Sequence, residues 1–197
     1  MPPDRLTQLL AKIDALNSED PTTEIVDGAA RPRELVYAER LSAWVLRWHP
    51  EASEALRIAA RGQHVRRWTI PRDRYERTRR GYLRWRETLK AFHVQEVARL
   101  MEEVGYPGAM IERVKVLMSK RALGTDAETQ TLEDALCLVF LETQYADLRR
   151  RTPEPAMRQV LRKTWAKMSE PARAAARALP LGEADRRALE QALLESP

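Results

Sequence analysis

The sequence is poor in the residues that build disulfide-bonded, β-rich or membrane-spanning proteins. Its one cysteine, Cys137, excludes an internal disulfide and a cysteine-based zinc site within one chain. Seven glycines and few β-branched runs argue against a sheet protein. No apolar run approaches the roughly 20 residues that a membrane span needs. The first residues, MPPDRLTQLL, lack a signal-peptide pattern, so we expect a cytoplasmic protein that does not enter a membrane.

The composition is that of an ordered protein with one sizeable core. Of the 197 residues, 44% are hydrophobic and 32% are charged, with both signs abundant. The formal net charge of +5 favours anionic partners. Arginine makes up 28 of the 34 basic residues, which a GC-rich genome also produces. We therefore give more weight to local clusters of charge than to the total.

Helical periodicity covers nearly the whole chain, and it predicts an all-α fold of about eight or nine helices. Expected helix ends include Asp73 and Ser169 as N-caps, a capping box of Thr125 and Glu128, and Gly105 as a C-cap. The stretch NSEDPTTEIVDGAARP is expected to be a polar loop. The expected helices cover about 6–13, 34–48, 51–62, 82–104, 107–120, 125–149, 153–168, 170–179 and 183–194.

We expect one main domain with a short addition. Residues 1–168 are predicted to form the helical domain. Residues 169–197 are predicted to be an Ala-rich helical extension that packs on the same domain. The chain shows no internal repeat and no long linker.

The three histidines limit where a metal could bind, because metal ligands must converge and lose their protons. His64 ends an apolar helix face in RIAARGQHVRRW. His93 and Glu96 lie three residues apart in AFHVQEVARLM and so share a helix face. His64 and His93 are therefore candidate metal ligands, although His93 and Glu96 could also pair with each other on the surface. His49, beside Pro50 at a helix junction, is interpreted as a surface residue.

Two acids lie at the start of the most apolar helix. QTLEDALCLVFLE is apolar nearly all round, so it is expected to be buried. A carboxylate of Glu133 or Asp134 that faces such a core would cost several kcal/mol without a cation. At least one of the two should therefore have a strong partner. A metal ion, a network of arginines or the partial positive charge at the N-terminal end of the helix would each satisfy this requirement.

The segment from Arg61 to Arg86 contains ten arginines and only two acids, Asp73 and Glu76. Aromatic residues are interleaved with the arginines. The guanidinium fork grips phosphate or carboxylate in two places. The segment therefore predicts an anionic small-molecule substrate, and nucleic acid is a possible partner. The alternative is that these arginines face solvent or neutralise the buried acids. The candidate substrate-binding residues are Arg67, Arg72, Arg84, Arg86, Lys163 and Lys167.

Three stretches resemble the HD-domain superfamily of metal-dependent phosphohydrolases. They are ALRIAARGQHVRRW, HVQEVARLMEEVGYPGAMIERVKVLMSK and LEDALCLVFLE. The resemblance implies an HD-domain-like helical bundle with a divalent metal ion, either Zn, Mn, Mg or Fe. It places candidate metal ligands at His64, His93 and Asp134, and Glu96, alone or with Glu133, could join them. In a hydrolase of this kind, Glu133 or Glu96 would serve as the general base.

The sequence departs from the superfamily pattern at three places. Gln63 and His64 stand where the family has a His-Asp pair. Tyr37 stands where its first histidine belongs, and Lys120 stands where metal-rich members carry another histidine. The usual ligand set is therefore incomplete, and the fold could have been retained without the metal.

At a finer level, the chain is similar to an uncharacterised bacterial and fungal family known only as a domain of unknown function. Four segments carry this match, across about residues 11–175: QHVRRWTIPR, GYLRWRETLK, QTLEDALCLVFLE and KTWAKMS. The family implies no activity.

Three functions remain open from the sequence. The first is a metal-dependent hydrolase of an anionic, phosphorylated or nucleotide-like small molecule. The second is a non-catalytic helical module that binds an anionic ligand or RNA through its arginine-rich face. The third is a di-iron oxygenase, for which the chain has few histidines.

Overall fold

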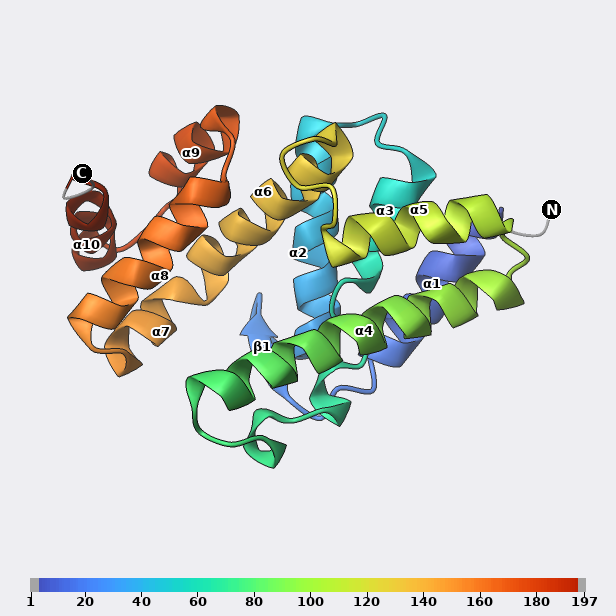
Figure 1. Cartoon of the computed structure of the whole chain (residues 1–197), viewed down its shortest axis with the longest axis horizontal. Coiled ribbons are helices and arrows are strands. Elements are labelled where there is room, and N and C mark those ends of the chain that lie inside the picture. The colour runs from blue at the N-terminus through green and yellow to red at the C-terminus, as the bar shows by residue number, and fades with distance from the viewer. Residues whose placement is uncertain (1–3, 195–197) are drawn as a thin grey trace. The chain divides into compact units, whose positions relative to one another are not determined.

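The computed structural model describes residues 4–194, and its regular structure is helical apart from one short hairpin (Figure 1). This confirms the predicted all-α class. The chain divides into two compact units, Met1–Thr129 and Gln130–Pro197, and the boundary falls inside a helix. The expected division between residues 168 and 169 stays a prediction.

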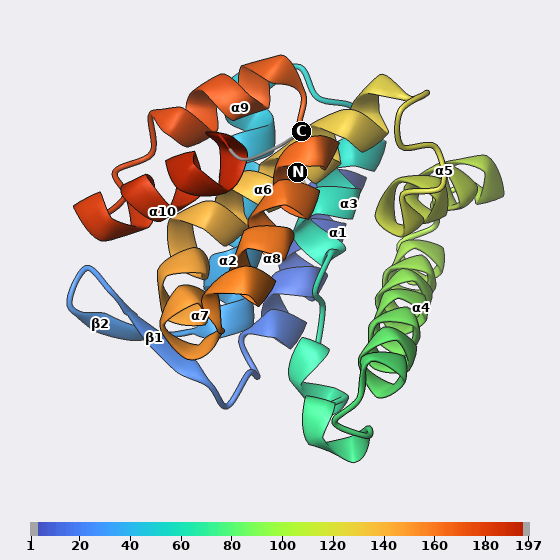
Figure 2. The ribbon, with the colours of Figure 1, turned by 60° about the vertical axis from the view of Figure 1, so that its left-hand side comes forward.

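The first unit is built around a short central helix. Its elements are α1 (Arg5–Asn17), β1 (Thr23–Val26), β2 (Ala29–Pro32), α2 (Arg33–Trp48), α3 (Glu54–Gly62), two 3-10 turns (Arg67–Thr69 and Arg72–Arg74), α4 (Arg79–Glu103) and α5 (Gly108–Ser119). Helix α3 contacts α1, α2, α4 and α5, so it forms the centre of this unit. Helix α5 turns back against α4, as Figures 1 and 2 show.

Helix α3 can lie at the centre because it is small and apolar. Ser53 caps it, with its hydroxyl accepting the Leu56 N–H at 3.1 Å. At its other end, a Cβ on Gly62 would lie 2.3 Å from Cγ2 of Val97 on α4. Glycine therefore permits the close approach of the two helices just before His64. The buried residues of α3 are Ala55, Leu56, Ile58, Ala59, Ala60 and Gly62.

The stretch expected to be a polar loop contains a β-hairpin. Strands β1 and β2 pair antiparallel, with Val26 opposite Ala29. The two residues between them, Asp27 and Gly28, both have positive φ, at 50° and 80°. An Asp-Gly pair in this conformation is a strong hairpin signal that the prediction missed. Figure 2 shows the hairpin projecting from the first unit.

Helix α4 begins later than its predicted cap. Asp73 lies in a 3-10 turn, so its assignment as an N-cap is wrong. Thr78 caps α4 instead, and its hydroxyl accepts the Gly81 N–H at 3.1 Å. The predicted C-cap is confirmed, because Gly105 has a φ of 79° after the last turn of the helix.

Helix α6 (Ala127–Thr143) begins with a different cap from the predicted box. Asp126 accepts the Thr129 N–H at 2.7 Å, whereas the Thr125 hydroxyl donates to the Ala122 carbonyl. Arg113 binds both Asp126 and Glu128, so the carboxylate is held in place for capping. The predicted capping box is therefore wrong by one residue.

The second unit contains the rest of α6 and four further helices. They are α7 (Tyr145–Arg151), α8 (Glu154–Lys167), α9 (Glu170–Arg177) and α10 (Glu183–Leu194). The predicted continuous helix to Arg149 is interrupted at Gln144. The Thr143 hydroxyl donates to the Val139 carbonyl at 2.7 Å in the last turn before this break. Ser169 caps α9, as predicted.

Candidate functional site

The first unit brings two predicted metal ligands together. His64 follows the end of α3, and His93 lies in the middle of α4. Their ring centroids are 5.8 Å apart and the rings are tilted by 37°. The third predicted ligand, Asp134, belongs to the second unit.

His93 is a buried imidazole with one nitrogen left without a partner. Its side chain lies in the core, and the residue is 3% exposed. Its Nδ1 lies 2.9 Å from the Val65 carbonyl oxygen. Because a carbonyl can only accept, Nδ1 carries the proton and Nε2 presents a lone pair. No hydrogen-bond partner for Nε2 lies within the described residues. Burial, followed by repulsion from His64, lowers the pKa of His93 to about 3.

His64 is held on two sides. Its ring stacks on Tyr37, with centroids 4.1 Å apart and an interplanar angle of 11°. Its Nδ1 lies 3.4 Å from Oε2 of Glu34. Burial lowers the pKa of His64 well below its usual value, and the charge of Arg67 lowers it further. Both imidazoles are therefore neutral at neutral pH, which is the form that binds metals.

Glu34 is a functional candidate that the sequence analysis did not single out. It lies in the first turn of α2 and is 4% exposed. Its Oε1 lies 3.8 Å from Nε of Arg67 and 3.9 Å from Nη2 of Arg33, which is too far for hydrogen bonds. Burial raises the pKa of the Glu34 carboxyl, and the Arg67 charge offsets part of this rise. Glu34 is therefore a buried acid surrounded by donors that it does not directly bond.

A sequence signal for Glu34 existed. Tyr37, Ala38 and Leu41 follow it by three, four and seven residues, and all are buried on one face of α2. A glutamate at the next position of that same face must be buried with them. An acid on the apolar stripe of an amphipathic helix is the pattern that would have identified it.

The turn that carries His64 is held in an uncommon backbone conformation. Arg66 has a φ of 53°, in the left-handed region that few residues other than glycine adopt. Its N–H donates to Oδ1 of the buried Asn17 at 3.2 Å. The bond fixes the turn between His64 and the 3-10 helix that begins at Arg67. A strained residue beside a buried polar cluster is typical of a functional site.

The predicted arginine cluster separates into residues with different partners. Arg67 reaches toward Glu34 and stacks over the Trp85 ring, 5.0 Å from its centroid. Arg72 donates to the carbonyls of Tyr75 and Glu76 at 2.8 and 2.7 Å, so it fastens the loop before α4. Arg84 and Arg86 are exposed on α4.

Glu96, a predicted general base, lies on α4 among arginines. Its Oε2 is 3.4 Å from Nη1 of Arg66 and 3.6 Å from Nη2 of Arg99. The side chain is 17% exposed. Paired in this way, Glu96 belongs to a surface ion network.

The predicted residues of the second unit form their own contacts. Oδ1 of Asp134 accepts the Ser169 N–H at 2.8 Å and the Gln130 side-chain amide at 2.9 Å, and its Oδ2 accepts the Ser169 hydroxyl at 2.5 Å. Glu133 pairs with Nζ of Lys167 at 3.1 Å. Lys163 is exposed on α8. The strong partner expected for the buried acids is therefore present for both, as hydroxyl and amide donors for one and an ammonium group for the other.

The donors of the first unit fit a metal only in part. Across residues 4–194, no group of three or more His, Cys, Asp or Glu side chains is arranged to hold a metal ion. Two neutral imidazoles are nevertheless adjacent, each with its Nδ1 facing an oxygen acceptor. That outer-shell arrangement is typical of metal-binding histidines. An ion at this place would have His64 and His93 as its protein ligands.

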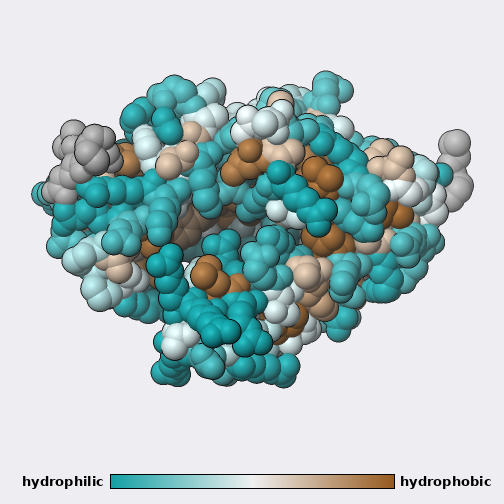
Figure 3. All heavy atoms as spheres, in the orientation of Figure 1, coloured by the Kyte–Doolittle hydropathy of each residue, from teal (hydrophilic) through white to brown (hydrophobic). Residues whose placement is uncertain are grey.

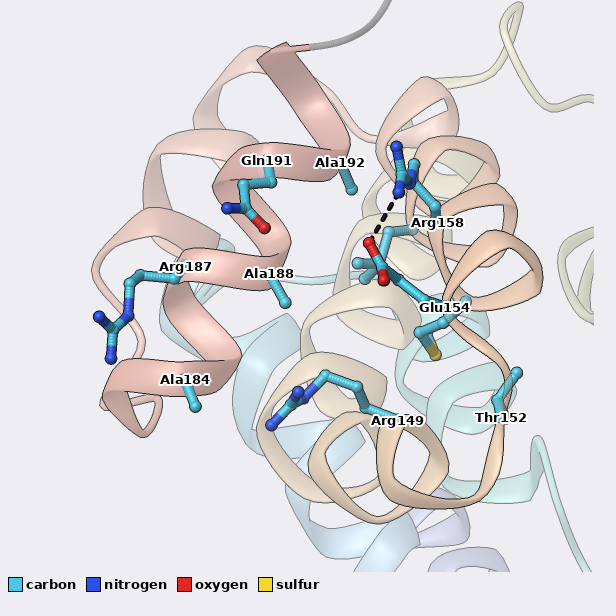
Figure 4. Close-up of a pocket in the computed structure, with 11 residues that line it drawn as sticks. Arg149, Thr152, Glu154, Arg158, Ala184, Arg187, Ala188, Gln191 and Ala192 are labelled. Atoms are coloured by element: carbon cyan, nitrogen blue, oxygen red, sulfur yellow. Dashed lines mark hydrogen bonds and ion pairs between the residues drawn. The ribbon is translucent and has the colours of Figure 1, made fainter.

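The second unit also contains a groove of about 550 Å³ between α7, α8 and α10 (Figure 4). Small side chains of α10, namely Ala184, Ala188 and Ala192, line one side of it. The arginines at the groove have acidic partners, which largely cancel their charge. These pairs are Arg158 with Glu154 at 2.7 Å, Arg149 with Asp185 at 2.5 Å and Arg187 with Glu183 at 3.2 Å.

The fold and the site define an all-α protein whose first unit encloses two neutral imidazoles and a carboxylate. A family model described as a domain of unknown function, DUF4202, matches residues 7–189, and the chain belongs to this family. No curated protein and no solved structure matches the chain. Among residues 4–194, no helix combines the length and the apolar character that crossing a bilayer requires.

Proposed function

We propose that the chain is a metal-dependent hydrolase of an anionic, phosphorylated or nucleotide-like small molecule, with its site in the first unit. The observation that carries this proposal is the buried Nε2 of His93, which has a lone pair and no hydrogen-bond partner among residues 4–194, on a ring that lies beside His64. Buried polar atoms are usually satisfied by protein groups, ordered water or a ligand. The resemblance of ALRIAARGQHVRRW and the segments after it to HD domains supports the same function.

A divalent ion held by His64 and His93 would lower the pKa of a bound water and polarise a phosphoryl oxygen. The Val65 carbonyl fixes the tautomer of His93, so that Nε2 stays available. Tyr37 and Glu34 orient the ring of His64. The chain thus presents two nitrogen ligands that need no proton loss at neutral pH.

Glu34 is the carboxylate best placed to accept a proton. Its raised pKa brings it closer to neutral pH, as a general base requires. Glu96 and Glu133, the bases expected from the sequence, are each paired with basic side chains. We therefore assign this role to Glu34.

Arginine side chains supply the anion recognition. Arg67 is held against Trp85, whose indole N–H donates to the Ile70 carbonyl at 2.9 Å. Braced in this way, its guanidinium would lose little freedom when it binds a phosphate. Arg33 approaches the same carboxylate from α2. A phosphorylated substrate would give both arginines a closer partner than Glu34 now provides.

Metal binding tests the proposal without any substrate. We expect wild-type protein, purified without a histidine tag, to bind about one Mn²⁺ or Zn²⁺ per chain in calorimetry after removal of metal by chelation. His64→Ala and His93→Ala should each weaken binding about tenfold or more. His49→Ala is the matched control, because His49 is exposed at the end of α2. Unchanged binding by both variants would exclude this ligand set.

Activity is the second measurement. We expect phosphate release from small phosphoesters or nucleotides to depend on added metal, and Glu34→Gln to lower kcat while metal is still bound. Iron with visible colour would support the di-iron oxygenase instead. Protein without metal that retains an anionic ligand would support the non-catalytic module, for which the exposed arginines of α4 are the favouring observation.

A further inference from the structure

The loop before α4 and the first turns of α4 carry arginines without acidic partners. Within the part of the chain that the structure describes, Arg74, Arg77, Arg79, Arg80 and Arg84 are all exposed and form no ion pair. The acids in this stretch, Asp73 and Glu76, are exposed and pair with none of them. In Figure 3 the region over the start of α4 is largely hydrophilic.

Exposed basic residues elsewhere in the chain are commonly paired on their own helix. Arg158 pairs with Glu154 at 2.7 Å, and Lys115 pairs with Glu112 at 2.7 Å. Arg187 pairs with Glu183 at 3.2 Å. Residues 72–86 contain seven arginines and two acids, a surplus of five positive charges that equals the formal net charge of the chain. The surplus charge is therefore concentrated in this stretch of the first unit.

This concentration works against the stability of α4. The N-terminal end of a helix carries partial positive charge, so acids are favoured there and bases are not. Helix α4 nevertheless begins with Arg79 and Arg80 and has no acid in its first turn. Arg80 and Arg84 are four apart, which adds like-charge repulsion along one face. Because folding does not benefit from these arginines, a bound anion is the natural explanation for them.

An exposed aromatic ring lies among the same arginines. Tyr82 is 42% exposed, and the Arg86 guanidinium lies 5.9 Å from its ring centroid. A base of a flexible strand can stack on such a ring while arginines bind the flanking phosphates. The neighbouring Leu83, 52% exposed, is the single strongly exposed aliphatic side chain among the described residues 72–86. One such residue is a weak basis for membrane binding, so the composition favours nucleic acid.

We propose that residues 74–86 form a binding surface for single-stranded nucleic acid, with the unpaired arginines on the phosphates and Tyr82 stacked on a base. We name it the 74–86 surface. Arginine suits this role because its planar fork binds phosphate oxygens in two places. The unpaired arginines of this surface are not those that approach Glu34, and binding there does not depend on metal binding or hydrolysis.

The test is the affinity of the full chain for a labelled single-stranded RNA of mixed sequence, measured by fluorescence anisotropy at several salt concentrations. We expect the double variant Arg77→Glu with Arg80→Glu to bind about tenfold more weakly or worse. The matched control is Arg121→Glu with Arg151→Glu. It makes the same change in net charge at two exposed cations that form no ion pair within the described residues. Its affinity should stay within about twofold of wild type.

Stability separates binding from folding in this test. Because Arg80 lies in the first turn of α4, glutamate there should leave Tm unchanged or raise it. Loss of binding together with an undiminished Tm supports the proposal. Tyr82→Leu should weaken binding of a single strand about fivefold or more and affect a duplex less.

Three results would overturn the proposal. One is equal weakening by the control variant, which would show that net charge alone attracts the strand. Another is the absence of salt-dependent binding to single strands of RNA and DNA. The third is tight binding to phosphatidylserine vesicles, lost in the double variant, by a protein that does not bind either strand. That result would assign the surface to a membrane instead.

Discussion

His93 in the first unit and Asp134 in the second are both buried polar residues, at 3% and 4% exposure, yet they differ in how their polar atoms are satisfied. Asp134 accepts hydrogen bonds from the backbone and hydroxyl of Ser169 and from Gln130. His93 makes one bond to Val65, and its second nitrogen has no hydrogen-bond partner among residues 4–194. The carboxylate is thus built into the structure, whereas the imidazole keeps an available lone pair.

The difference shows which kind of burial indicates function. From the sequence, a buried acid at the start of an apolar helix was expected to need a strong partner, because its burial is costly. The structure meets this cost with ordinary donors at the α9 cap. The weaker sequence signals, His64 and His93, are the residues whose chemistry the fold leaves unused.

The largest expected effect is a loss of stability of the first unit at low pH, caused by the buried imidazole of His93. The folded-state pKa of His93 is about 3 and its unfolded value is 6.5, so the unfolded chain binds more protons between these values. The contribution of neutral His93 to the free energy of unfolding should therefore be complete above pH 6.5. It should be lost as the pH falls toward 3, by up to about 5 kcal/mol. Glu34 opposes this in part, because its raised pKa favours the folded state as it takes up a proton. Urea unfolding with a chelator present, at a series of pH values, measures the slope.

His93→Gln should flatten that slope, and His49→Gln should leave it unchanged. The glutamine amide can still donate to the Val65 carbonyl, so the variant removes the titrating group and keeps the bond. An unaltered acid midpoint in His93→Gln would mean that other groups govern the transition.

The next effect concerns the second unit. Asp134→Ala leaves the Ser169 N–H and hydroxyl without their acceptor, whereas the Gln130 amide keeps its bond to the Lys167 carbonyl, and we expect a loss of about 3 kcal/mol in the free energy of unfolding. Asp134→Asn keeps one acceptor oxygen and should lose less. Because the imidazole pair lies in the first unit, we expect both variants to bind metal as wild type does. Normal stability with loss of metal in Asp134→Ala would reverse the comparison and make Asp134 a ligand.

The smallest effect tests the support beneath His64. Gly62→Ala places a methyl group 2.3 Å from Cγ2 of Val97, so the Val97 side chain or the two helices must shift. We expect a loss of about 2 kcal/mol in the free energy of unfolding, and weaker metal binding if the shift reaches His93 on α4. Gly108→Ala is the control, since a Cβ there has no atom within 4 Å. Thermal unfolding of both variants decides the matter, and an equal Tm would show that the helices can yield at this contact.

The helical class and most helix positions follow from the sequence, because apolar residues recur with helical spacing over long stretches. The misses have local causes. The hairpin rests on Asp27 and Gly28, two residues within a polar stretch whose strands are only four residues long. The break at Gln144 follows a hydroxyl-to-carbonyl bond that no periodicity reveals.

The two imidazoles of the site were predicted from the sequence, and their carboxylate was not. Histidine is rare in this chain, so His64 and His93 stood out by type alone. Glu34 was identifiable as a buried acid on the apolar stripe of α2, but its place beside His64 was not, because nothing local brings α2 beside the turn after α3. The arginines between Arg61 and Arg86 could not be sorted either. Whether each one reaches Glu34, a loop carbonyl or only solvent depends on tertiary packing.

The hydrogen bond between Asn17 and Arg66 has a consequence for the order in which parts of the site can fold during synthesis. Its two residues are 49 positions apart, and the asparagine comes first. During synthesis, α1 can already offer its amide oxygen when the left-handed turn leaves the ribosome. The Val65 carbonyl must wait for a donor 28 residues further along. The turn after His64 can thus be fixed by Asn17 before His93 has been synthesised. His93 then packs against a turn whose conformation is already in part determined.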